Sequence, residues 1–233
     1  LLSHSIQSLE KFIRKKQLFN FFKHKPKVAL LSKYHYSKRS FLTKIFGHFL
    51  LPYGVDDIFI NTDLNNVSYI NSKQAIFTSR VDRNSELLIE IWKKKIFPFQ
   101  NDLKLLVTPG YYKNIENFNI YLRNLGSRQS MINNLIESRV FLIPGHKAEL
   151  YCLAAEEARE LCLPIITLGI GSLSERVIHN QTGFIANNHK EFADYTLEVF
   201  RNDDLWKELR SNLFNLRGSK TWNKSAKTLL QNI

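Results

Sequence analysis

Short apolar runs alternate with amphipathic segments along most of this 233-residue chain, and this alternation constrains its fold more than any other feature. Continuous apolar runs of three to six residues are typical of strands that are buried on both faces of a parallel sheet. The expected strands are LLS (1–3), VALLS (28–32), AIFTS (75–79), LKLLVT (103–108), FNIYL (118–122), RVFLI (139–143), PIITL (164–168) and GFIA (183–186).

Segments with helical periodicity separate these runs. The expected helices cover 85–97, 128–138, 150–162 and 191–202, followed by terminal helices over 203–216 and 222–233. Regular alternation of strands and helices predicts an α/β protein with a Rossmann-like, doubly wound parallel sheet.

The segment 51–74 interrupts this pattern, because it is rich in turn residues and has little periodicity. The part before it has too few strands for a complete layer, whereas the part after it has about six. We therefore expect a boundary near residues 55–72. The predicted organisation is a remnant of an N-terminal domain with its linker over 1–60, a Rossmann-like domain over 61–216, and a C-terminal helix within 217–233. Whether that helix crosses back to pack on the N-terminal domain stays open.

The net charge of +12 indicates anionic partners. Much of this charge lies early, in KFIRKKQLFNFFKHKPK (11–27), which mixes cations with Phe, Leu and Ile. A basic amphipathic helix of this kind can lie on an anionic membrane surface. An ordinary surface helix with Phe inward and Lys outward explains the pattern equally well. Nucleic acid is not expected as a partner, because no recognition-helix, RNP-like or zinc-finger pattern accompanies the charge.

The chain has no run of about 18 apolar residues and no signal-peptide pattern, so neither a transmembrane helix nor a leader is expected. It begins without Met, which leads us to expect that an upstream part is missing. Cys152 and Cys162 would lie roughly 15 Å apart on one helix, too far for a disulfide. Such cysteines indicate a reducing compartment and thus the cytoplasm, and without a Cys/His cluster they do not predict a zinc site.

Three expected strands are followed by residues suited to an anionic ligand, and ligands of open α/β sheets bind beyond the carboxyl ends of the strands. Two arginines can clamp a diphosphate, and glycines permit close backbone approach. Glu149 and Glu157, in AELYCLAAEEARELCLP (148–164), are either ligand-binding carboxylates or ordinary solvated glutamates. The residues that follow the three strands are Arg80 and Arg83 after 75–79, Gly145, His146 and Glu149 after 139–143, and Gly169, Gly171, Ser172 and Glu175 after 164–168.

The order of motifs from Pro144 onward resembles the donor site of retaining glycosyltransferases of family four, which have the two-domain GT-B fold. That family's pattern is roughly P-S-x-x-E-G-F-G-L-x-x-x-E-A, a G-x-P, V-I-x-x-x-x-G-G-x-x-E and T-G. This chain has PGHKAELYCLAAEEA, LCLPII, GIGSLSE and QTGFIA in the same order. Glu149 and Glu157 match the E-x7-E element, whereas Glu156 has the wrong spacing. PYGVDDIF (52–59) and FTSR (77–80) resemble the family's interdomain segment and its V-G-R strand end.

The resemblance implies roles for particular residues. Glu149 would contact hydroxyls of the transferred sugar, and Glu157 would contact the ribose hydroxyls of the nucleotide. Arg80 would stabilise the departing diphosphate, and Arg83 would take the place of the family's lysine. Two cations there would compensate the charge of the leaving group without a metal, and no cofactor is expected. His4, in LLSHS, would face the donor sugar.

The start of the helix is the remaining element of the expected site. Glu149 would precede the helix, and the amides of Tyr151, Cys152 and Leu153 would bind anionic oxygen. Leu150 and Cys152 stand where the family has glycines, and Ser172 replaces the second glycine of its G-G pair. These departures bear on the identity of the donor more than on the family.

The expected function is transfer of a sugar from a nucleotide-diphosphate sugar to a glycan or lipid-linked acceptor, with retention, in cell-surface polysaccharide or lipid-linked glycan synthesis. The expected location is the cytoplasm, at the inner face of the membrane if segment 11–27 binds lipid. Two alternatives stay open: a non-catalytic module that binds a nucleotide or sugar phosphate, and a peripheral membrane protein that acts through 11–27.

Overall fold

The computed structural model describes residues 9–64, 71–110 and 113–232. The chain divides into two compact units. The small unit comprises Leu1–Gly54 and Lys220–Ile233, and the large unit is Val55–Ser219. The domain limits expected at residues 60 and 216 stay predictions.

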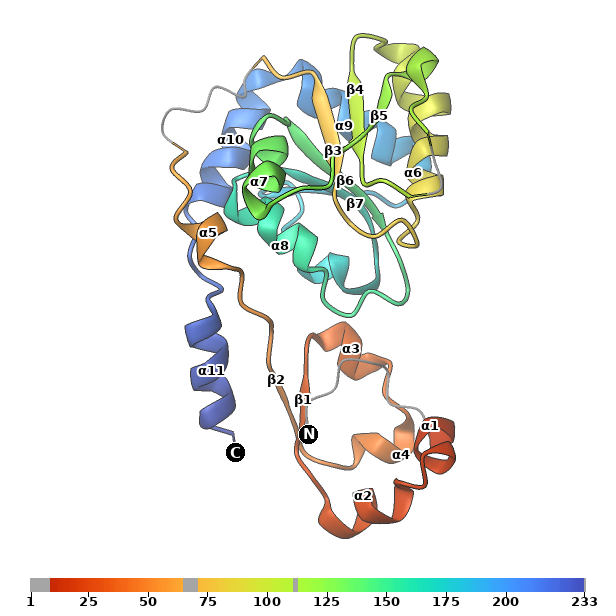
Figure 1. Ribbon diagram of the computed structural model, residues 1–233, viewed down its shortest axis with the longest axis vertical. Coiled ribbons are helices and arrows are strands. Elements are labelled where there is room, and N and C mark those ends of the chain that lie inside the picture. The colour runs from red at the N-terminus through yellow and green to blue at the C-terminus, as the bar shows by residue number, and fades with distance from the viewer. Residues whose placement is uncertain (1–8, 65–70, 111–112, 233) are drawn as a thin grey trace. The chain divides into compact units, whose positions relative to one another are not determined.

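The large unit is built around six parallel strands in the spatial order β5-β4-β3-β6-β7-β8 (Figure 1). Numbered along the unit, this order is 3-2-1-4-5-6, so the direction of winding reverses between β3 and β6. The strands are β3 (Gln74–Phe77), β4 (Lys104–Val107), β5 (Ile120–Leu122), β6 (Val140–Gly145), β7 (Ile165–Ile170) and β8 (Gly183–Ile185).

Helices cover both faces of this sheet, with α8 in front of it and α9 behind it in Figure 1. The α-helices of the unit are α5 (Asp57–Ile60), α6 (Ser85–Ile91), α7 (Arg128–Ile136), α8 (Leu153–Glu160), α9 (His189–Arg201) and α10 (Asp203–Phe214). A π-helical turn, η1 (Trp92–Ile96), and the 3-10 turns η2 (Phe97–Phe99), η3 (Glu116–Phe118) and η4 (Gly171–Glu175) complete it.

Burial explains why the apolar runs form strands. All six residues of β6, the strand in the middle of the sheet, are buried, and Ala75, Ile76 and Phe77 of β3 beside it are fully buried. A strand covered by helices on both faces must be apolar along its whole length. The predicted α/β fold with a doubly wound parallel sheet is confirmed.

The small unit contains two parallel strands, in which Val28 pairs with His48 and Leu30 with Leu50. Its buried cluster consists of Phe21, Val28, Leu30 and Phe46. The elements are α1 (Leu9–Arg14), α2 (Leu18–His24), β1 (Val28–Leu30), α3 (Lys33–Ser37), α4 (Phe41–Lys44), β2 (His48–Leu50) and α11 (Trp222–Leu230).

Two sequence-based expectations differ from the structure here. The basic segment 11–27 is not one helix, because Lys16 and Lys25 adopt left-handed backbone angles (φ 52° and 42°) that end α1 and α2. Strand β2 was also missed, because it has only three residues and the short apolar run 49–51 does not by itself distinguish a strand from a linker. In the structure His48 and Leu50 are exposed. The strand expected at 1–3 lies outside the described residues. In the described part of the chain, no helix is long and apolar enough to cross a membrane.

Gly183 shows why the Thr-Gly of QTGFIA is needed at the start of β8. Its φ is +147°, and a Cβ there would lie 2.0 Å from the carbonyl oxygen of Ile165 on β7. We expect Gly183→Ala to lower the free energy of unfolding by more than about 2 kcal/mol, because strain and overpacking add. Urea unfolding followed by circular dichroism measures this.

Gly47→Ala is the matched control, because the nearest atom to a Cβ at Gly47 is Lys27 Cγ at 3.5 Å, an ordinary contact. Equal effects of the two substitutions would contradict the close approach of β7 and β8 at Gly183.

Candidate functional site

The carboxyl ends of β3 and β6 form the edge at which the strand order reverses. Loops 78–84 and 146–152 follow these two neighbouring strands, and the connections leave in opposite directions along the sheet. Such a switch point opens a crevice at the carboxyl edge of the sheet, where α/β proteins bind ligands. Expected site residues lie on both loops.

Arg83 and Glu149 meet at this edge. Arg83 Nε lies 3.3 Å from Glu149 Oε2, and the two side chains are only 17% and 16% exposed. Arg83 Nη1 also lies 3.4 Å from His146 Nδ1. The Cys152 amide donates to Glu149 Oε1 at 3.2 Å, so both oxygens of the carboxylate have partners. The structure therefore joins the loops after β3 and β6 through an ion pair between two expected site residues.

Arg80 is oriented differently from Arg83. Its guanidinium donates to both carboxylate oxygens of Asp82, at 3.1 and 2.7 Å, and its side chain is 74% exposed. Arg83 Nη1 lies 3.6 Å from the same carboxylate. Asp82 therefore lies between the two arginines, a position that the sequence interpretation did not consider although the residue stands between them in SRVDRN.

Helix α8 begins at Leu153, three residues later than expected. Cys152 is its N-cap, with φ 61° and ψ 78°, and this left-handed conformation prevents the helix from starting earlier. The expectation that Tyr151 and Cys152 supply amides of the first helical turn is therefore wrong. Those amides belong to Leu153, Ala154 and Ala155, and the amide of Cys152 is used by Glu149.

Glu157, further along α8, is partly buried. Burial raises the pKa of its carboxyl from 4.5 to about 7, while Arg128 opposes the increase and Asp56 adds to it. Among the residues that the structure describes, no ion pair or hydrogen bond to this carboxylate is found. Asp56 and Arg128 form an ion pair with each other. Glu157 is thus a carboxylate with unused acceptor capacity.

Gly171 brings the loop after β7 against the loop after β6. Its φ is 78°, and a Cβ there would lie 2.4 Å from the His146 carbonyl oxygen and 2.9 Å from that of Glu149. The Ser172 amide donates to the Glu149 carbonyl oxygen at 2.9 Å. The backbone of Glu149 is therefore anchored independently of its side chain.

A buried ionic network lies beneath this loop. Glu156 Oε1 lies 2.5 Å from Arg176 Nη1, and Glu156 Oε2 lies 3.2 Å from Arg159 Nε. Arg159 also binds Glu160, whose other oxygen accepts from the Gly218 amide at 2.8 Å. Both glutamate side chains are fully buried.

The network reaches the expected site through Tyr151. The Arg176 guanidinium carbon lies 4.4 Å from the centre of the Tyr151 ring, and burial raises the pKa of that phenol. Sequence reasoning set Glu156 aside because its spacing did not fit the family pattern. The signal that could have identified it is the Glu-x-x-Arg pair in an otherwise Ala-, Leu- and Cys-rich helix, since charges there must be paired.

Cys152 and Cys162 are free cysteines, as their expected separation predicts, and both are buried. Burial raises the pKa of both thiols, that of Cys162 to about 11, so neither is a reactive thiolate at neutral pH. Among the described residues, no group of three or more His, Cys, Asp or Glu side chains could hold a metal ion. His4 lies outside the described residues.

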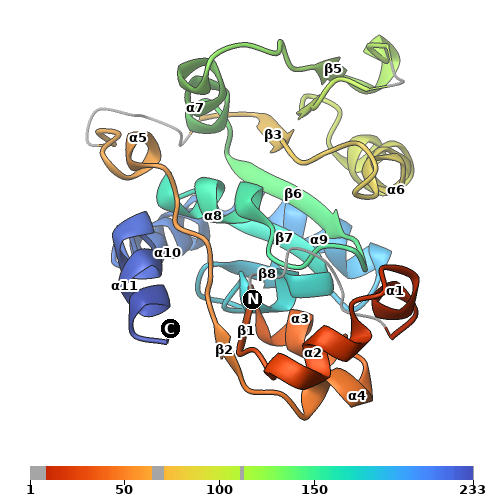
Figure 2. The same ribbon diagram turned by 60° about the horizontal axis from the view of Figure 1, so that its bottom comes forward.

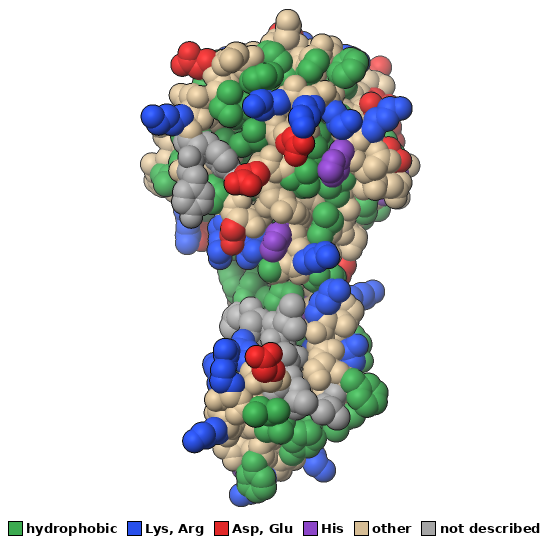
Figure 3. Space-filling view, turned by 90° about the vertical axis from the view of Figure 1, so that its right-hand side faces the viewer, with side chains coloured by type: hydrophobic (Ala, Val, Ile, Leu, Met, Phe, Trp, Pro, Cys, Tyr) green, Lys and Arg blue, Asp and Glu red, His purple; other side chains and the backbone are tan. Residues whose placement is uncertain are grey.

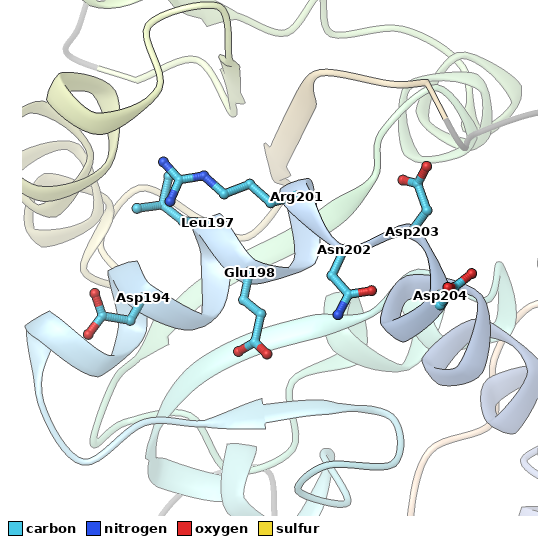
Figure 4. A pocket seen from close by; sticks show the side chains of 7 residues that line it. All are labelled: Asp194, Leu197, Glu198, Arg201, Asn202, Asp203 and Asp204. Carbon is cyan, nitrogen blue, oxygen red and sulfur yellow. The ribbon is translucent and has the colours of Figure 1, made fainter.

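A cleft of about 720 Å³ lies elsewhere, at the end of α9 and the start of α10 (Figure 4). Its acidic lining includes Asp194 and Glu198, which does not suit a diphosphate. Two of its polar side chains also have protein partners, because Arg201 donates to the Phe99 carbonyl oxygen and Asp203 binds Arg139. We therefore keep the candidate site at the switch between β3 and β6.

The buried network predicts a large effect of removing Glu156. Glu156→Ala leaves the guanidinium groups of Arg159 and Arg176 without this carboxylate, and we expect a loss of roughly 3 to 5 kcal/mol in the free energy of unfolding. Glu156→Gln keeps the shape and should lose less. Urea unfolding measures both. Glu90→Gln, which breaks the exposed pair with Lys94, is the control and should change stability little. Similar effects at the two sites would contradict the network.

Glu157 predicts a pH dependence of stability. Because its pKa of about 7 in the folded protein exceeds the ordinary 4.5, the folded state binds more protons than the unfolded state between these pH values. The free energy of unfolding should therefore fall as pH rises from 4.5 to 7, with a slope of at most about 1.4 kcal/mol per pH unit from this group. Urea unfolding across this range measures the slope, which Glu157→Gln should reduce.

Glu191→Gln is the control, because the pKa of Glu191 is shifted in the opposite direction from that of Glu157. Hydrogen bonds from the Asn187 backbone and side chain lower the pKa of Glu191, so its contribution to stability is present above the ordinary pKa and is lost only at acid pH. Between pH 5 and 7 the Glu191→Gln profile should run parallel to that of the wild-type protein. A wild-type slope unchanged by Glu157→Gln would contradict the raised pKa.

No family model matches the chain, and no curated protein matches it in sequence. Solved structures do match in fold. A mutant of S. aureus TarM in complex with fondaparinux, alpha-GlcNAc-glycerol and UDP superposes with a TM-score of 0.75 at 19% identity, covering 94% of this chain and 45% of TarM. Sucrose-phosphate synthase from Thermosynechococcus elongatus has a TM-score of 0.75 at 16% identity, over 99% of this chain and 65% of that one.

Anabaena HepE in complex with UDP and glucose matches with a TM-score of 0.72 at 14% identity, over 98% of this chain and 70% of HepE. The chain spans less than half of TarM and 65% of the sucrose-phosphate synthase. These proteins are GT-B glycosyltransferases. This chain therefore has an α/β fold similar to that of GT-B glycosyltransferases and spans only part of the length of such chains.

Proposed function

We propose that this chain is the donor-binding part of a glycosyltransferase that uses a nucleotide-diphosphate sugar. The observation that carries the proposal is the Arg83–Glu149 pair at the switch between β3 and β6. A guanidinium can bind phosphate and a carboxylate can bind sugar hydroxyls, and the two lie side by side at the edge where α/β folds bind ligands. The fold similarity supports the same class of reaction, since TarM and HepE have been solved with UDP.

In the proposed complex, the diphosphate binds the guanidinium of Arg83. It also binds the guanidinium of Arg80, whose side chain turns away from Asp82. The backbone amides at the start of α8, from Leu153 to Ala155, add partial positive charge on the side of the diphosphate away from the two arginines. These donors stabilise the diphosphate as it leaves, and no metal is required for that. The proposal thus keeps both arginines expected from the sequence and moves the three helix amides along the chain by two residues.

Once Arg83 engages phosphate, Glu149 Oε2 is free to accept from hydroxyls of the donor sugar, while the Cys152 amide still holds Oε1. Glu157 accepts hydrogen bonds from the ribose hydroxyls, since no ion pair or hydrogen bond to its carboxylate is found among the described residues.

The finer reaction follows from the family resemblance. The acceptor is a glycan or a lipid-linked glycan, the sugar is transferred with retention, and the departing phosphate helps to deprotonate the acceptor hydroxyl. His4 is the proposed contact to the reaction centre from the N-terminal side. The reaction takes place in the cytoplasm, at the inner face of the membrane when the acceptor is lipid-linked.

Calorimetric titration with UDP, GDP and ADP tests the donor site. We expect one of these nucleotides to bind, and Arg83→Met to weaken binding about 10- to 100-fold, because a charge-assisted contact to phosphate is lost. Arg201→Met is the matched control, since Arg201 binds Phe99 and Gln100 at the far end of α9. Equal loss in the two variants, or no binding of any nucleotide, would contradict the site.

Hydrolysis of the matching nucleotide sugar distinguishes an enzyme from a binding module. A glycosyltransferase without its acceptor should release sugar slowly, and Glu149→Gln should reduce that rate more than it reduces nucleotide affinity. If the chain binds the nucleotide but does not hydrolyse the nucleotide sugar, and a longer chain with upstream sequence does not either, the result would support the non-catalytic alternative.

A further inference from the structure

The net positive charge of the chain comes from the small unit. Residues 1–54 and 220–233 contain 14 of the 33 Lys and Arg but one of the 21 Asp and Glu, Glu10, for a formal charge of +13. The large unit has the other 19 cations and 20 acids, for a charge of −1. A donor site in the large unit therefore does not account for the charge of the small one.

The small unit also exposes large apolar side chains. Phe19 and Phe41 are 75% and 80% exposed, and Ile45 and Ile13 are 65% and 57% exposed. Figure 3 shows hydrophobic and basic side chains interspersed on this unit. Singly exposed apolar residues are normal on a protein surface, but aromatic side chains among many lysines need a common explanation.

Aromatic packing connects α2 with the residues that follow α4. The ring of Phe46 lies 4.5 Å from that of Phe21 and 5.2 Å from that of Phe22, both in edge contacts, so Phe46 joins the chain after α4 to α2. Helices α2 and α4 lie side by side in Figures 1 and 2. We name Phe19, Phe22, Phe41 and Ile45 the apolar patch of the small unit.

Helical spacing gives each half of the patch a common face. Phe19 and Phe22 are three residues apart on α2, and Phe41 and Ile45 are four residues apart along α4 and its C-cap. Lys23 in α2 and its neighbours Lys15, Lys16 and Lys25 are exposed. The apolar patch is thus surrounded by lysines, and Glu10 is the one acidic residue of the small unit.

We propose that the apolar patch and the surrounding lysines bind the small unit to an anionic lipid bilayer. Lysines next to an anionic leaflet are attracted by its surface potential, and Phe and Ile side chains enter the boundary between headgroups and acyl chains. This combination favours a bilayer over nucleic acid, because base stacking would need a groove that tracks a phosphate backbone. The structure differs from a simple basic amphipathic helix, since α4 supplies half of the apolar side chains.

Co-sedimentation of the whole chain with lipid vesicles tests the proposal. Vesicles of phosphatidylcholine containing about one third phosphatidylglycerol should bind the protein at least about tenfold more strongly than pure phosphatidylcholine. Binding should weaken severalfold in about 1 M NaCl, because the charges are screened. Equal affinity for both vesicle types, or no binding, would overturn the proposal.

The triple variant Phe19→Ser, Phe41→Ser, Ile45→Ser should reduce binding to the anionic vesicles by about tenfold or more and keep its circular dichroism spectrum, because these side chains are exposed. Lys15→Gln with Lys23→Gln should also weaken binding and reduce its salt dependence. Phe99→Ser is the matched control, since Phe99 is 67% exposed in the large unit and follows the basic run Lys93–Lys95.

Other occupants of the patch give distinct results. If the triple variant binds vesicles as well as the wild-type protein, charge alone acts, and tight binding to heparin would then identify a polyanion surface. If the triple variant instead abolishes self-association detected by light scattering, the patch is an interface between copies of the chain. If Phe99→Ser weakens vesicle binding as much as the triple variant, the membrane contact lies on the large unit. Each of these results overturns the proposal.

Discussion

The close approach of two loops at Gly171 is the constraint on which the candidate site depends. A Cβ at this position would collide with the carbonyl oxygens of His146 and Glu149, so only a glycine lets the loop after β7 pack against the loop after β6. The Ser172 amide then holds the Glu149 backbone. Because the backbone of Glu149 is fixed in this way, its carboxylate can exchange partners without displacement of the loop. A ligand that binds Arg83 therefore competes with the carboxylates of Glu149 and Asp82 and leaves the backbone of the loop in place.

The buried charges below the loop serve a different purpose from those at the site. Glu156 and Glu160 have fully buried side chains and are compensated by Arg159, Arg176 and the Gly218 amide. Glu157, between them in sequence, faces a different environment and lacks such partners among the described residues. Buried charges are tolerated when they are paired, and a carboxyl without partners responds by a raised pKa. Three glutamates within five residues thus divide into two that stabilise the fold and one suited to binding.

The fold could be predicted from the sequence because the strands of the large sheet are short, mostly apolar runs that alternate with amphipathic segments, with few exceptions such as Gln74 and Lys104. Arg83 and Glu149 could be identified because loops after neighbouring parallel strands meet at one edge. The start of α8 could not be predicted, since it depends on the left-handed conformation of Cys152, which residue type alone does not specify. The ionic network was missed for a related reason. Arg176 is 20 residues from Glu156, and only the tertiary structure brings them together.

The net charge of the whole chain was a misleading guide to the donor site. A charge of +12 indicates anionic partners, but the large unit that contains Arg83 and Glu149 is close to neutral. Binding of a diphosphate there must rest on a few oriented donors at short range, which salt screens weakly when they are partly buried. Most cations of the small unit are exposed and act at longer range, so their effect is sensitive to salt. Two anionic partners of different size, a nucleotide and a bilayer, therefore explain the charge pattern better than one.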